Sequence, residues 1–159
     1  MSLDRATERL WGAYVRANLS MIMARMELVT ESHHLDGQIS QALATATDRL
    51  HALLLLEAFP RSRSHGHFEV LVLLACSAHS DMNLASDLVE RLDREWVITR
   101  IGAAIEHTLS HSGAEGYRLV GGLLERVAPE LLAEHLHRCS HHPDPDIREV
   151  ALSYRETGA

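Results

Sequence analysis

Three histidine-containing turns recur in the second half of the chain at nearly constant spacing. His79, His111 and His142 are separated by 32 and 31 residues. At each turn an apolar segment with helical spacing precedes the histidine, and a second amphipathic segment follows it. A helix pair of this length cannot bury both apolar faces alone, so neighbouring pairs must stack. The repeat therefore predicts an all-α chain that ends in about three helix pairs stacked as a short α-solenoid.

Apolar positions agree between the three units when the histidines are aligned. Two positions show this, one before the turn and one after it: Leu73, Ile105 and Leu136, then Leu88, Val120 and Ala151. First helices are expected at 96–109 and 130–139, the second of them introduced by Pro129 at a favoured helix-start position. These units are expected to form one continuous domain over residues 65–156.

The first sixty residues carry longer helical patterns. Apolar residues alternate between spacings of three and four along a predicted helix over 3–31, at Leu3, Leu10, Tyr14, Ala17, Met21, Ala24 and Leu28. A second helix is expected over 38–58, where Pro60 ends it. Two such helices joined by a short loop are expected to pack as an antiparallel hairpin. Residues 1–60 are therefore expected to be a cap or a dimerisation element.

The last turn and the helix after it read DPDIREVA, from Asp144 to Ala151. This segment resembles the turn and second-helix start of HEAT repeats and of related HEAT-like and leucine-rich-variant repeats. The resemblance covers residues 65–156 and is strongest in the last unit. It implies a protein-protein interaction module or adaptor. It also implies that Arg148 pairs with a turn aspartate, here Asp144 or Asp146, or with a neighbouring repeat.

The two earlier units depart from this pattern. They have Leu84-Ala85 and Gly116-Tyr117 where the last unit has Ile147-Arg148. In a solenoid of this kind the second helices form the concave side, which usually binds the partner. Candidate partner-binding residues there are Glu90, Arg91, Tyr117, Arg118, Glu125, Arg148 and Glu149. Ordinary solvated side chains are the alternative interpretation of each.

The chain has 12 histidines, and this number raises the alternative of a metal site. His107 and His111 are four residues apart, so both rings lie on one helix face. Together with His135 and His137 they define a candidate metal site for a HEAT-like enzyme or accessory factor. A HEAT-like di-iron hydroxylase takes its ligands from His-Glu dipeptides, but here Glu precedes His at 106–107 and 134–135. We therefore expect first that the chain binds no cofactor and that the histidines are incidental, exposed residues.

Charge and composition exclude several function classes. The formal net charge is −7 and no lysine occurs, which argues against nucleic-acid binding and removes lysine-based chemistry. No hydrolase or phosphate-loop motif occurs, so no enzyme activity is expected. The sequence also lacks an apolar run long enough to cross a membrane and a secretory leader pattern, so a cytoplasmic location is expected. Cys76 and Cys139 are expected to be buried small hydrophobes.

Three methionines give the first predicted helix apolar groups on more than one face. Met21, Met23 and Met26 could pack against the repeats, or they could form an adhesive surface for self-association. Both interpretations are left open by the sequence.

Overall fold

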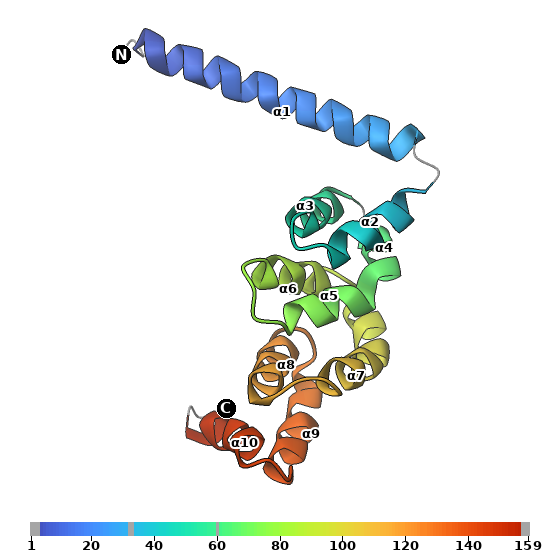
Figure 1. Ribbon diagram of the computed structural model, residues 1–159, viewed down its shortest axis with the longest axis vertical. Helices are drawn as coiled ribbons and strands as arrows, with labels where there is room; N and C mark the ends of the chain where they lie inside the picture. The colour runs from blue at the N-terminus through green and yellow to red at the C-terminus, as the bar shows by residue number, and fades with distance from the viewer. Residues whose placement is uncertain (1–3, 32–33, 60, 157–159) are drawn as a thin grey trace. The chain divides into compact units, whose positions relative to one another are not determined.

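The computed structural model describes residues 4–31, 34–59 and 61–156. Every regular element in these ranges is helical and no strand occurs within them, which confirms the all-α fold class (Figure 1). The chain divides into two compact units, Met1–Gln41 and Ala42–Ala159, and each is described by itself. No helix in the described ranges is long and apolar enough to cross a bilayer.

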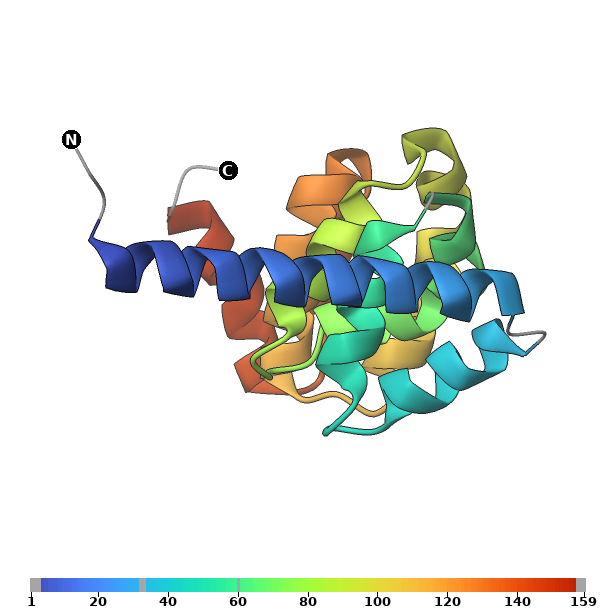
Figure 2. The ribbon, with the colours of Figure 1, turned by 90° about the horizontal axis from the view of Figure 1, so that it is seen from above.

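The first unit is dominated by α1, Arg5–Glu31, an unbroken helix of 27 residues (Figure 2). The long helix predicted from the three-four spacing is confirmed, although Ser2 and Leu3 lie outside the described residues. None of the residues of α1 is buried. The short helix α2, Leu35–Ala44, begins in this unit and buries Leu35, Ile39 and Leu43, which are four residues apart on one face.

The single helix predicted over 38–58 is wrong, because the chain forms α2 and then α3, Arg49–Ala58. The intervening turn contains two β-branched threonines and an aspartate, which are weaker helix formers than the leucines on either side. The Arg49 Nε group donates to the backbone carbonyl of Leu43 at 3.2 Å. It thereby satisfies a carbonyl that the end of α2 leaves unpaired. The predicted end of this segment near Ala58 is confirmed.

The second unit continues through a short linker into three helix pairs. The linker contains α4, Arg61–Ser64, and the 3-10 turn η1, His65–His67. The pairs follow in chain order: α5 (Phe68–Ala75) with α6 (Met82–Glu90), α7 (Arg94–Leu109) with α8 (Ala114–Val127), and α9 (Pro129–Ser140) with α10 (Pro145–Glu156). Helix α7 begins two residues before the predicted 96 and α9 one residue before the predicted 130, and each repeated histidine lies in the turn between the two helices of its pair.

Successive pairs also contact one another. Helix α5 packs against α7, α6 against α8, and α8 against α10 (Figure 1). Fully buried aliphatic side chains fill this unit at the positions with three-four spacing, among them Leu71, Val89, Ile101, Val120 and Val150. Adjacent pairs therefore contact one another in chain order, whereas stacking as an α-solenoid and membership of the HEAT-like class both stay predictions. The proposed role of residues 1–60 as a cap or dimerisation element also stays a prediction.

Candidate functional site

The most exposed apolar surface among the described residues lies along α1. We call it the α1 apolar surface; its members are Leu10, Trp11, Tyr14, Val15, Leu19, Met21, Ile22, Met23, Met26, Leu28 and Val29. Their side chains are 37% to 66% exposed. Isolated surface leucines are ordinary, but a contiguous apolar surface of this kind marks an interaction site.

The three methionines singled out in the sequence all belong to the α1 apolar surface. Met21, Met23 and Met26 are 44%, 61% and 63% exposed. Trp11 and Tyr14 lie one helical turn apart, with ring centroids 5.5 Å from each other. The helix thus presents flexible thioethers and large aromatic rings together, which are the side chains that contribute most contact area to protein interfaces.

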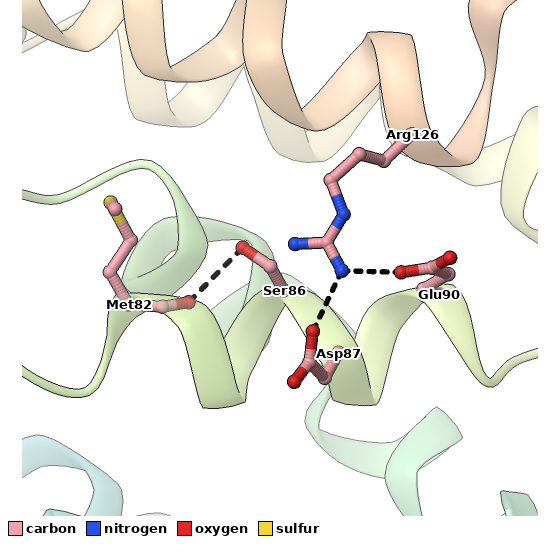
Figure 3. Close-up of polar contacts among 5 residues, drawn as sticks. All are labelled: Met82, Ser86, Asp87, Glu90 and Arg126. Carbon is pink, nitrogen blue, oxygen red and sulfur yellow. Dashed lines mark hydrogen bonds and ion pairs between the residues drawn. The ribbon is translucent and has the colours of Figure 1, made fainter.

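Two of the predicted partner-binding residues make contacts between helices of the second unit. Glu90 of α6 accepts from Arg126 of α8, and the same Arg126 nitrogen reaches Asp87 at 2.7 Å (Figure 3). Arg91 donates to the backbone carbonyl of Glu57 near the end of α3 at 3.1 Å. These contacts join different helices of the second unit.

The remaining candidates are exposed or occupied locally. Arg118 pairs with Glu115 at 3.1 Å within α8. Arg148 donates to the carbonyls of His142 and Pro143 at 2.9 and 2.7 Å, so its hydrogen bonds go to the turn backbone rather than to the expected aspartate. Glu125 and Glu149 are exposed.

Tyr117 is packed against His135 of α9 and against His142 of the turn that follows α9. Its ring lies 5.9 Å from the ring of His135 and 5.4 Å from that of His142. The His135 Nε2 group donates to the Tyr117 carbonyl at 2.9 Å. Burial is the main cause that raises the pKa of Tyr117 and lowers that of His135. The structure therefore joins a predicted partner residue and a predicted metal ligand in one packing cluster, which sequence spacing does not reveal.

The four histidines of the candidate metal site do not converge. His107 and His111 are exposed, with ring centroids 6.3 Å apart, and His137 is exposed beside His141 on α9. His135 is buried and bonded to the Tyr117 carbonyl. Within the described residues, no group of three or more His, Cys, Asp or Glu side chains is placed to hold a metal ion.

Two of the repeated histidine turns each contain the same type of hydrogen bond. The Asp81 backbone N–H donates to His79 Nδ1 at 3.1 Å, and the Asp144 N–H donates to His142 Nδ1 at 3.1 Å. In each turn the imidazole accepts from the residue two positions later. In the middle turn, His111 Nδ1 instead lies 2.7 Å from the Ser110 hydroxyl. His79 and His142 thus stabilise their turns through this bond, a role that the sequence analysis did not assign to them.

An open pocket of about 470 Å³ lies beside the last histidine turn in the second unit. It is lined by Tyr117, His142, Arg138 and the exposed pair His137 and His141, among others. The Arg138 guanidinium is already paired with Glu106 of α7 and with Glu134 of its own helix. The positive charge of Arg138 is therefore balanced by the protein itself.

Comparisons with known proteins found no matching family model, no similar curated protein and no similar solved structure. The resemblance of the last unit to HEAT-like repeats consequently rests on its sequence pattern and on nothing else.

Proposed function

We propose that this chain is a protein-protein interaction module or adaptor that acts in the cytoplasm. In this proposal α1 supplies the adhesive surface, and the helix pairs of the second unit are HEAT-like repeats that form the scaffold. The observation that carries the proposal is the exposure of the α1 apolar surface on a helix without a buried residue. The free cysteines Cys76 and Cys139 are compatible with the reducing cytoplasm.

The energy of burying such side chains supports this function. Complete burial of one leucine or methionine side chain is worth about 1.5 to 3 kcal/mol. Several of these groups covered together would offset the entropy lost when two proteins associate. Most of the stability of a protein helix comes from packing one of its faces, and α1 has no buried face. A partner would therefore stabilise α1 as well as bind to it.

The test is affinity capture with the full chain as bait, read by quantitative mass spectrometry. Leu28 of α1 and Leu73 of α5 form a matched pair, being 37% and 39% exposed. We expect Leu28→Gln to lose a stoichiometric partner that the unaltered chain and Leu73→Gln both retain. Equal capture by both variants would contradict the proposal. So would an unaltered chain that binds no stoichiometric partner, neither another protein nor a second copy of itself.

A further inference from the structure

The α1 helix carries one stripe with the spacing of a two-helix interface. Its members alternate between steps of four and three residues, and we call them the α1 stripe: Leu10, Tyr14, Ala17, Met21, Ala24 and Leu28. All six are exposed. Alternation of this kind keeps one seam of a helix facing a partner helix along its whole length. From Leu10 to Leu28 the stripe is about 27 Å long at 1.5 Å per residue.

Large and small side chains alternate along the stripe in a way that suits an antiparallel copy of itself. If Leu19 lies at the centre of the pairing, Tyr14 of one copy faces Ala24 of the other. In the same register Met21 faces Ala17 and Leu10 faces Leu28. Each large group then meets a small one near the centre, and two leucines close each end. Interlocking of large and small side chains gives helix interfaces the density of a protein interior.

The charges of α1 also favour the antiparallel direction. Its first half carries Arg5, Arg9 and Arg16 against a single glutamate. Its second half carries Arg25 and, in the last turns, Glu27 and Glu31, so its net charge is negative. Antiparallel pairing places the basic half of one copy beside the acidic end of the other. Parallel pairing would place like charges side by side and align the two helix dipoles.

We propose that α1 binds the α1 helix of a second copy of this chain, antiparallel and in register about Leu19, through the α1 stripe. This inference rests on the proposed function and names the partner of the same surface. The small residues at the seam let the two helices approach closely, and the flanking arginines and glutamates select the direction. The rest of the α1 apolar surface, including Met23 and Met26, lies off this seam.

The first test is the oligomeric state of the full chain, measured by sedimentation velocity over a wide range of concentration. Met21 lies on the stripe, whereas Met23 lies off it and is equally polarisable and more exposed. We expect a dimer for the unaltered chain, a dimer for Met23→Glu, and a dissociation constant weakened by about tenfold or more for Met21→Glu. Circular dichroism confirms that both variants keep the helical second unit.

The direction is tested by cysteine cross-linking, because both natural cysteines are buried. In the antiparallel register, mixing Leu10→Cys with Leu28→Cys chains should give a disulfide-linked dimer, and neither variant alone should cross-link efficiently. Parallel pairing would give the opposite pattern, with each variant cross-linking to itself, and would overturn the inference.

The remaining outcomes separate this inference from the proposed function. A monomer at every concentration overturns self-pairing. The inference also fails if the unaltered chain is a monomer that binds a different protein or lipid vesicles and Met21→Glu abolishes that binding. Loss of a protein partner leaves the interaction module intact, whereas vesicle binding alone refutes the module as well. A monomer whose captured proteins are unaffected by Leu28→Gln refutes both.

Discussion

The hydroxyl oxygen of Tyr154 lies 2.6 Å from the position that a Cβ atom on Gly121 would occupy. Two further atoms of the Tyr154 ring lie 3.0 and 3.2 Å from the same position. Gly121 is buried on α8 and Tyr154 is on α10, so the missing side chain lets the two second helices approach. Burial is the main cause that raises the pKa of the Tyr154 hydroxyl.

This contact predicts different outcomes for two adjacent glycines. Alanine in a helix interior gains about 1 kcal/mol over glycine, and at Gly122 nothing lies within 4 Å of the added Cβ. Gly122→Ala should therefore raise the free energy of unfolding. At Gly121 the same gain is opposed by overpacking against Tyr154, which costs about 1 to 3 kcal/mol. Urea denaturation of both variants measures the difference, and equal midpoints would contradict the close approach.

Much of the second unit could be predicted because its signals are local. The three helix pairs follow from apolar spacing, and Pro129 stands at the start of α9 as expected. Each of these depends on residues within one or two helical turns, where propensity and burial agree. Both cysteines are buried, as expected of small hydrophobes in such helices.

The candidate sites were less predictable because they depend on contacts between distant residues. Glu90 looks like a free carboxylate in the sequence, and only the packing of α6 on α8 brings Arg126 to it, 36 positions later. Tyr117 and His135 meet across 18 residues in the same way. Leucine spacing does not predict the break between α2 and α3, because the spacing continues through it. The Arg49 contact that caps α2 is a specific hydrogen bond, which apolar spacing does not indicate.

Helix α7 should depend on its aspartate cap. The Asp93 carboxylate accepts from the Trp96 backbone N–H at 2.9 Å and satisfies one of the unpaired donors of the first turn. Asp93→Ala should lower the free energy of unfolding by about 1 kcal/mol. Asp81 stands at the same position before α6 but makes no capping bond through its side chain. Asp81→Ala is therefore the control, and thermal unfolding should show the smaller loss for it.

Stability should fall as the pH falls below about 6.5, the pKa of histidine in an unfolded chain. The pKa of His135 is lowered mainly by burial, against the opposing effect of its bond to the Tyr117 carbonyl. The pKa of His79 is lowered by burial and then by Arg49, while Asp81 and the Leu74 backbone oppose the shift. Below 6.5 the unfolded chain therefore binds more protons than the folded one, so protonation favours unfolding.

These two histidines make their full contribution to the free energy of unfolding above pH 6.5. That contribution is lost as the pH falls toward the pKa values they have in the folded chain. His135→Gln keeps a donor for the Tyr117 carbonyl but does not titrate. We expect the free energy of unfolding of this variant, measured with urea at a series of pH values, to fall less as the pH is lowered. Glutamine at the exposed His107 of α7, His107→Gln, is the matched substitution for comparison. Identical slopes for all three proteins would refute the role of His135.

The ion pairs of Arg126 should stabilise the contact between α6 and α8 by a small, salt-sensitive amount. The Arg126 side chain is 39% exposed, and the side chains of Asp87 and Glu90 are more exposed still. Pairs of this exposure contribute at most about 1 kcal/mol, and salt screens them. Arg126→Ala should therefore lower stability at low ionic strength and matter less in high salt. Arg118→Ala, which breaks only a pair within α8, should have the smaller effect; a salt-independent loss would point to packing instead.

The two cysteines should be unreactive in the folded chain. Burial raises the pKa of the Cys76 thiol to about 12, and burial is also the largest cause that raises the pKa of Cys139, partly offset by its backbone hydrogen bond and by Arg138. Cys139 lies 3.6 Å from His135 Nε2, but that nitrogen already donates to the Tyr117 carbonyl and cannot take up the thiol proton. Because the thiolate is the reactive form, an aromatic disulfide reagent should modify both thiols only after unfolding. The rate of modification should then follow the rate of global opening, which a rapid native reaction at either site would contradict.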